Sequence, residues 1–302
     1  MIRKGRMTDR KAIYDLHSAK VNIDGYDGME FYFSQLFDPQ NVLVNDINSH
    51  VCASVQVNCH EVMLNDVRIA AGFVFSPIGS RDNPEYLQQL MTEVLDEQTY
   101  KTLITILQTN DGENYQKLGF APLYKKRYYD IMAANLKNVS SQGVMKEFTM
   151  KEVAHTYRSF TSFFNGYYIR DEEYWQTLLE HLKFRRGSIV VYRNTEGTVE
   201  GYMIYHLLQQ KLVVDEIIYL TGEALVRLVC YGLQMKDTVS VSVSQDENLG
   251  RVFSKLKCTV RTDLWVRIND LKLFNSLYQC EVTSAAEGFA LSQKPLFINE
   301  YR

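Results

Sequence analysis

One continuous segment in the first half of the chain constrains the fold more than any other. It begins with the apolar, strand-like run Thr102–Leu107, passes through a polar turn into the short amphipathic stretch 112–118, and returns to an extended run, Leu123–Ile131, after Gly119–Phe120. β-Branched and aromatic residues favour strands, and glycine permits the sharp turn between helix and strand. The segment predicts a strand, a short helix and a second strand, with Tyr115 near the end of the helix.

Helical and strand-like patterns alternate before this segment as well. We expect a helix over 8–19 capped by Thr8–Asp9, strands over 50–57 and 67–75 separated by 58–66 with a turn at Asn65–Asp66, and a helix from Asn83–Pro84 to Leu95. The two strands read as an antiparallel hairpin, and the helix carries an apolar face at helical spacing. This order favours an α/β architecture of the α+β type, in which helices cover a mixed sheet.

The second half partly repeats this order after a polar stretch, 133–143, which is the best linker candidate. The expected elements are helices over 150–164 and 171–184, strands over 188–192, 199–207 and 211–219, a helix over 223–234 and a strand over 238–243. We therefore predict two tandem domains of the same kind, each a mixed, mostly antiparallel sheet flanked by helices. The second is a degenerate copy.

Composition excludes several classes of protein. The 302 residues carry a net charge of −3, which offers no field for nucleic acid or an anionic membrane, and no apolar stretch reaches the roughly 18 residues that a membrane helix needs. A cytoplasmic protein is the simplest expectation. The five cysteines are odd in number and lack C-x-x-C spacing, so we expect reduced thiols, mostly in the core. Because the histidines also lack metal-site spacing, no metal is expected.

Two motifs resemble the acyl-CoA site of GNAT-type N-acetyltransferases. They are Gly72–Pro77 and Tyr115–Phe120, the latter matching the family pattern Y-x-x-x-G-F. More narrowly, the chain resembles the Eis (enhanced intracellular survival) branch through landmarks in the second half, which are Arg170–Trp175, Gly201–Tyr205, Val214–Glu216 and Trp265–Asp270. Singly, these landmarks could be core aromatics, Trp175 and Tyr202 among them, or a structural ion pair between Arg267 and Asp270.

The resemblance implies a cofactor site for acetyl-CoA as co-substrate. Its pantetheine would lie along Phe73, Val74 and Phe75, and its phosphates near a turn after that strand. The further residues implied in cofactor binding are Gly79, Ser80, Arg81, Asn110 and Asn114. The turn departs from the family pattern R-x-x-G-x-G/A, because Asp82 and Glu85 add negative charge and Pro84 lacks an N–H. We expect weaker cofactor binding than in relatives, and a plain surface turn is the alternative.

The resemblance also implies catalytic and substrate residues. Tyr115 would be the general acid that protonates the departing thiolate, since a phenol is neutral at pH 7. The terminal carboxylate, on Arg302, would be the base; a frayed tail is the alternative. Asp24 and Asp27 would favour a cationic amine, although Asp-Gly pairs also simply make turns.

These residues imply three domains and one leading activity. The domains are an acetyl-CoA-binding domain over 1–135, a degenerate second domain over 145–275, and a tail over 276–302, which would be the remnant of the family's sterol-carrier-like domain. The activity is transfer of an acetyl group to a primary amine of a small molecule or peptide by direct attack. The alternatives are a non-catalytic acyl-CoA-binding or scaffold protein, and an aminoacyl or acyl transferase acting on peptides. The family resemblance also makes a homo-oligomer possible.

Overall fold

The computed structural model describes residues 1–18, 28–109 and 111–299. They form two compact units, each assembled from several segments. The first unit comprises residues 1–62, 67–123 and 264–291, and the second comprises 63–66, 124–263 and 292–302. Whether the expected limits 1–135 and 145–275 mark independent domains stays a prediction.

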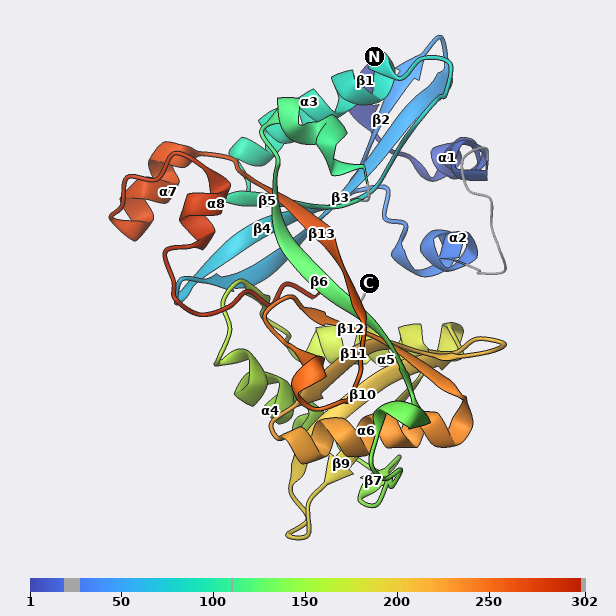
Figure 1. The fold of residues 1–302 in the computed structure, drawn as a ribbon. Helices are drawn as coiled ribbons and strands as arrows, with labels where there is room; N and C mark the ends of the chain where they lie inside the picture. The colour runs from blue at the N-terminus through green and yellow to red at the C-terminus, as the bar shows by residue number, and fades with distance from the viewer. Residues whose placement is uncertain (19–27, 110, 300–302) are drawn as a thin grey trace. The chain divides into compact units, whose positions relative to one another are not determined.

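The first unit contains a mixed sheet in the order β1-β2-β3-β4-β5-β13, seen in the upper part of Figure 1. Its strands are β1 (Ile2–Lys4), β2 (Val42–Ile47), β3 (His50–Leu64), β4 (Val67–Gly79), β5 (Ile104–Gln108) and the end of β13 (Cys258–Ile268). Its helices are η1 (Met7–Asp9), α1 (Arg10–Ser18), α2 (Gly28–Phe31), η2 (Tyr32–Leu36), α3 (Glu85–Thr99), η3 (Gly112–Leu118), α7 (Leu271–Tyr278) and α8 (Ala285–Phe289). β4 pairs with β5 in parallel, whereas β1–β2, β2–β3 and β5–β13 pair antiparallel.

Apolar clusters lie on both sides of this sheet. On one side, α3 buries Leu90, Met91 and Val94 together with Val74 of β4 and Leu107 of β5. The other cluster contains Ile13 of α1, Tyr32 and Phe33 of η2, and Val42 and Val44 of β2. The helical spacing of the α3 residues explains why the sequence predicted this helix, which begins one residue after Pro84 and extends beyond Leu95 to Thr99.

The β3–β4 hairpin is longer than the sequence suggested. Asn65 and Asp66 have φ values of 49° and 61°, the left-handed conformation of a tight hairpin turn, so the predicted turn is confirmed. However, the segment 58–64 was expected to connect the strands, and it instead continues β3 to Leu64. Val62 and Leu64 are fully buried, which explains why this stretch joins the sheet.

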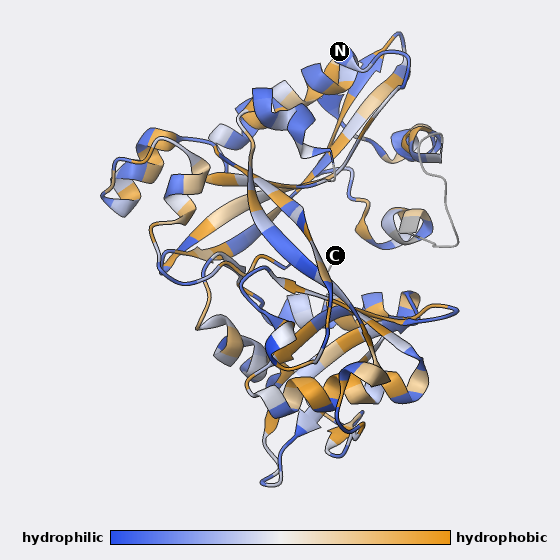
Figure 2. Cartoon of the chain, viewed as in Figure 1, coloured by the Kyte–Doolittle hydropathy of each residue, from blue (hydrophilic) through white to orange (hydrophobic). Residues whose placement is uncertain are grey.

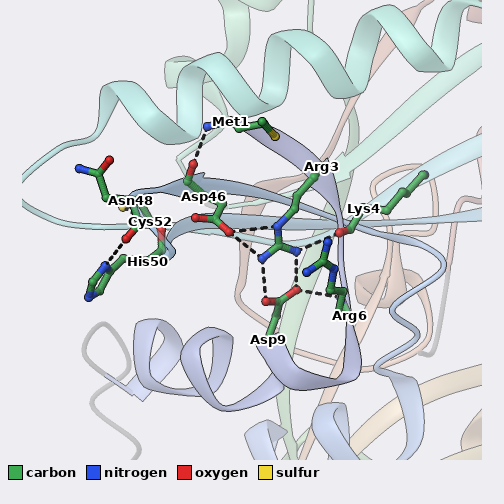
Figure 3. Close-up of polar contacts among 9 residues, drawn as sticks. All are labelled: Met1, Arg3, Lys4, Arg6, Asp9, Asp46, Asn48, His50 and Cys52. Atoms are coloured by element: carbon green, nitrogen blue, oxygen red, sulfur yellow. Dashed lines mark hydrogen bonds and ion pairs between the residues drawn. The ribbon is translucent and has the colours of Figure 1, made fainter.

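A network around Arg3 holds the amino-terminal elements together (Figure 3). Its guanidinium donates to Asp9 at 2.7 and 2.9 Å and to Asp46 at 2.8 Å, and the backbone N–H of Arg6 donates to Asp9 at 2.8 Å. The predicted helix start is therefore wrong in detail. Asp9 belongs to η1, which precedes α1, and its carboxylate accepts hydrogen bonds from Arg3 and Arg6, which come before η1 in the chain. The hydrogen bonds from Arg3 lower the pKa of Asp9.

The second unit contains the strand order β13-β6-β12-β11-β10-β9-β7, with β6 (Ala121–Met132) entering from the first unit. The further strands are β7 (Val144–Met145), β8 (Tyr167–Tyr168), β9 (Ser188–Arg193), β10 (Val199–Leu207), β11 (Leu212–Tyr219) and β12 (Thr238–Ser244). The helices are η4 (Ala133–Asn135), α4 (Met150–Thr161), α5 (Glu172–Phe184), α6 (Gly222–Met235) and η5 (Leu249–Arg251). β11 pairs with β12 in parallel, and β9–β10, β10–β11 and β6–β12 pair antiparallel.

Two apolar clusters of the second unit account for this order. α6 packs with Val239 and Val241 of β12, whereas α4 and α5 pack with Tyr202 and Ile204 of β10. Figure 2 shows apolar residues, in orange, along the strands and on α6. The predicted helices and strands of this half are confirmed within a few residues, as is the expected mixed, mostly antiparallel sheet flanked by helices.

The cysteines correct one expectation. All five are free, but only Cys230 is buried; Cys59 and Cys258 are exposed, and Cys52 and Cys280 are half-buried. Most of the thiols are therefore not part of the core. Within the described part of the chain, no helix is long and apolar enough to cross a membrane.

Candidate functional site

The parallel strands β4 and β5 part before β4 ends. Their pairing runs from Ala71 opposite Ile104 to Val74 opposite Leu107, while β4 continues to Gly79. Ser76 has a φ of 53°, a left-handed conformation that bends a strand. Beyond Val74, the edge of β4 that faced β5 makes no further ladder pairs with it among the described residues. That edge offers backbone N–H and C=O groups to an extended ligand, as an added strand would use them.

The side chains of the predicted pantetheine strand serve the core. Val74 joins the cluster beneath α3, and the ring of Phe75 lies 5.2 Å from that of Tyr32. Phe73 is buried as well. A ligand along this strand would therefore meet its backbone, which agrees with the expectation that the strand supplies main-chain groups.

A serine and a histidine meet at the bend of β4, and sequence reasoning missed both. Ser76 Oγ lies 3.2 Å from Nε2 of His17. His17 is on α1, 7% exposed, with its ring 5.7 Å from Tyr32 and 5.9 Å from Phe33. The available signal was its position one turn after the buried Ile13, on the apolar face of a predicted helix.

Two residues of the predicted phosphate turn, residues 79–85, make contacts within the fold. A Cβ added at Gly79 would lie 2.8 Å from Cβ of Leu87, so glycine here allows α3 to pack closely on β4. The backbone N–H of Ser80 donates to the carbonyl of Cys52 at 2.8 Å. These observations account for both residues without a ligand.

The rest of the turn retains groups that suit an anion. The backbone N–H groups of Arg81, Asp82 and Asn83 make no hydrogen bond to any residue that the structure describes, and the Arg81 side chain is exposed. Free N–H groups and a guanidinium fit a phosphate. The exposed carboxylates of Asp82 and Glu85 lie in the same turn and oppose it. The turn therefore fits a polyphosphate, with reduced electrostatic attraction.

Tyr115 lies on η3, the short helix that the sequence predicted over 112–118, which is a 3-10 helix and ends at Gly119 with φ 87°. Its ring is half-buried against the cluster that includes Val74 and Leu107. Burial, aided by the charge of Asp111, raises its pKa, so the phenol is neutral at pH 7. Its hydroxyl makes no hydrogen bond to a described residue and is available to a ligand.

The packing of Gly112 fixes the position of η3. A Cβ at Gly112 would lie 1.7 Å from Cε2 of Trp265, so only glycine allows η3 to lie against this ring. Asn114 follows on the exposed side of η3. The other predicted site residues, Asp24, Asp27, Asn110 and Arg302, lie outside the described residues. Within the described ranges, no group of three or more His, Cys, Asp or Glu side chains could hold a metal ion.

Three landmarks of the second half form one buried network. Arg170 donates to both carboxylate oxygens of Glu216 at 2.7 Å, and the Tyr202 hydroxyl donates to Glu216 at 2.7 Å. Burial opposes the charge on Glu216, but the charge and hydrogen bonds of Arg170 outweigh it and lower the pKa. The suggested ion pair between Arg267 and Asp270 is wrong: Arg267 donates to the carbonyl of Leu95, and Asp270 caps α7.

The parallel pair of the second unit parts as well, and the carboxyl-terminal segment contacts both of its strands. The β11–β12 ladder ends at Val214 opposite Val241. Beyond that point, Ser244 of β12 donates to the carbonyl of Leu296 at 2.9 Å, and Asn299 donates to Glu216 of β11 at 2.8 Å. Groups of β11 and β12 beyond the end of their ladder are therefore hydrogen-bonded to the carboxyl-terminal segment of the same chain.

Burial of that segment corrects the alternative of a frayed tail for the described residues up to 299. Phe297 is 5% exposed and Ile298 is fully buried. Phe297 also hydrogen-bonds through its backbone to Asn165 at 2.9 Å.

Comparisons with known proteins place this architecture. Residues 166–268 match a family described as an acetyltransferase (GNAT) domain. The matched residues do not include β4, α3, β5 or η3. No curated protein matches the chain.

Several solved structures share the fold. A conserved protein of unknown function from Enterococcus faecalis, described as a probable N-acyltransferase, has a TM-score of 0.73 at 17% identity over 90% of this chain and 72% of its own. A GCN5-related N-acetyltransferase from Anabaena variabilis gives 0.74 at 13% over 89% and 73%. Eis1 from Mycobacterium abscessus gives 0.66 at 13% over 91% and 75%. Residues 166–268 therefore match an acetyltransferase (GNAT) domain, and the chain shares the fold of these solved structures.

Proposed function

We propose that the chain is an acetyl-CoA-dependent N-acetyltransferase that acts on a primary amine. The observation that carries the proposal is the parting of β4 and β5 after Val74, beside a bend at Ser76. A pantetheine arm can hydrogen-bond to the open edge of β4 as an extra strand would. In this proposal the thioester lies at the bend of β4, where backbone N–H groups can stabilise the oxyanion.

Starting from the ammonium form, direct transfer removes two protons from the nitrogen and supplies one to the sulfur. The neutral amine attacks the thioester carbon, and the tetrahedral intermediate loses the second nitrogen proton as its C–S bond breaks. The departing thiolate is protonated to the thiol. Tyr115 is the proposed donor, because its half-buried phenol is protonated at neutral pH and its hydroxyl has no partner among the described residues. The ammonium proton must leave before attack. Its acceptor is the terminal carboxylate of Arg302, as the resemblance implies, or His17 acting through Ser76.

We further propose that the chain falls in the Eis-like branch. The similarity to Eis1 and the joining of the landmarks Arg170, Tyr202 and Glu216 in one network support this assignment. The carboxylates Asp24 and Asp27 remain the proposed attraction for a cationic amine. The acceptor is proposed as a small-molecule or peptide amine.

A specific observation favours the non-catalytic alternative. In the phosphate turn, Gly79 and the Ser80 N–H serve the fold, and the carboxylates of Asp82 and Glu85 oppose an anion. If these effects dominate, the site binds acyl-CoA too weakly to act. The double variant Asp82→Asn, Glu85→Gln should then restore binding that the wild type lacks.

Tyr115→Phe tests the catalytic proposal. Phenylalanine keeps the ring and its packing, so kcat should fall by about 10²-fold or more while acetyl-CoA affinity stays within about twofold. Thiol release with a panel of polyamines, aminoglycosides and lysine peptides gives the rate, and calorimetry gives the affinity. The matched control is Tyr14→Phe, an exposed tyrosine on α1. Equal turnover by wild type and Tyr115→Phe would remove Tyr115 from the mechanism, and no binding at millimolar acetyl-CoA would favour the scaffold.

A further inference from the structure

A cavity of about 930 Å³ opens on the second unit, and none of the residues that line it belongs to the proposed acetyl-transfer site. Its floor is formed by β6, β12 and β11, and its rim by the segment 255–261. Alternate residues of a strand point to opposite faces of a sheet. Tyr129 and Val241 pack with α6, so their neighbours Tyr128, Ser240 and Ser242 face the cavity on the other side.

The cavity is strongly basic within an acidic chain. Four cationic side chains line it, namely Lys211, Lys255, Lys257 and Arg261, against the single carboxylate of Asp130. Asp130 accepts a hydrogen bond from Ser240. None of the four cations forms an ion pair with a carboxylate in the described part of the chain. The whole chain has a net charge of −3, so the attraction for anions is local to this cavity.

An aromatic ring and hydroxyl groups complete the lining. The guanidinium of Arg261 lies over the ring of Tyr128 at 5.1 Å, and the Tyr128 hydroxyl donates to Asp263 at 3.2 Å. Both contacts hold Tyr128 in position. Ser242 and Thr259 add hydroxyl groups that can donate to phosphate oxygens. The combination suits a ligand with several negative charges and a planar group that stacks on tyrosine or arginine.

We propose that this cavity binds a small polyphosphate ligand of the nucleoside triphosphate class. Its volume falls within the range of roughly 300–1,000 Å³ that is typical of small-molecule sites. The lysines and Arg261 meet the phosphates, and Tyr128 meets the base. The four cations are confined to this one cavity, which favours a small molecule over a nucleic acid strand, because a strand needs a continuous track of positive charge. The site is independent of the proposed acetyl transfer.

Calorimetry on the full chain tests the site with two probes, ATP and inorganic triphosphate. We expect both to bind at low salt, ATP more tightly because of its base, and both to weaken as salt rises. Lys255→Gln, Lys257→Gln should weaken both by about tenfold or more, which corresponds to about 1.4 kcal/mol. The control Lys146→Gln, Lys151→Gln changes the charge equally in the same unit at exposed lysines away from the cavity, and should bind like wild type.

Cysteine alkylation locates the ligand without relying on activity. Cys258 is exposed and lines the cavity, Cys59 is exposed in the first unit, and Cys52 adjoins Ser80 of the predicted phosphate turn. ATP should slow alkylation of Cys258 alone. Protection of Cys52 instead, equal weakening by both double variants, or no binding at millimolar ATP and triphosphate would overturn the proposal. So would a single-stranded oligonucleotide that binds more tightly than ATP and loses binding in Lys255→Gln, Lys257→Gln.

Discussion

Glu216→Gln should destabilise the second unit by about 3–5 kcal/mol, the range for breaking a buried ion pair. The side chains of Arg170 and Glu216 are 0% and 1% exposed. Glu216 accepts four hydrogen bonds, two from Arg170 and one each from Tyr202 and Asn299. A glutamine amide keeps one acceptor oxygen and presents an NH₂ group to the remaining donors. It therefore leaves donors unsatisfied, each costing about 1–3 kcal/mol, beside an uncompensated guanidinium.

The matched control is the same substitution in an exposed pair of the same unit. Glu223 pairs with Arg227 at 3.0 Å, but their side chains are 59% and 25% exposed. Glu223→Gln should therefore cost less than about 1 kcal/mol. The double variant Arg170→Met, Glu216→Gln should lose less than the sum of its single variants, because it removes the unpaired charge.

Urea unfolding followed by tryptophan fluorescence measures these differences. Trp175 lies 5.3 Å from the Arg170 guanidinium in the second unit, whereas Trp265 belongs to the first. A Trp265→Phe background makes Trp175 the reporter for the second unit, and each variant is compared within that background. If Glu216→Gln costs no more than Glu223→Gln, the buried network does not stabilise the unit as argued.

Three further predictions concern packing, pH and catalysis. Gly112→Ala should destabilise the first unit by about 1–3 kcal/mol or more through its clash with Trp265, whereas Gly222→Ala, with open space around its Cα, should be neutral or stabilising. Thermal unfolding measures both, and equal melting temperatures of the two variants would contradict this prediction. Burial raises the pKa of Glu247 to about 7 from an ordinary 4.5, so the folded state binds the proton more tightly and loses about 3 kcal/mol of stability as pH rises from about 4.5 through 7. Glu247→Gln should flatten this dependence of the unfolding free energy on pH in urea titrations, and an unchanged dependence would refute the prediction. His17→Gln keeps a hydrogen-bonding side chain that cannot take up a proton near neutral pH. If His17 is the base, kcat should fall by about 10²-fold and the acidic limb of the pH–rate profile should disappear. An unchanged profile would leave the role of base to Arg302.

Local patterns in the sequence determined the individual elements and the fold class. The apolar spacing of α3, the turn at Asn65–Asp66 and the run from Thr102 to Phe120 each depend on residues close in the chain, so their structures follow from propensity, periodicity and turn chemistry. The extension of β3 through 58–64 escaped this reasoning, because its pairing depends on a strand on the other side of the turn. The candidate acid Tyr115 came from a local motif in the same way.

Only the tertiary structure decided which distant groups meet. The parting of β4 and β5, the contact of His17 with Ser76 and the burial of Glu216 beside Arg170 all join residues that lie far apart in the sequence. Each depends on which strands become neighbours and which helix covers them, and no local propensity encodes that choice. The basic cavity is another such case, because its cations come from separate segments that are close only in the folded second unit.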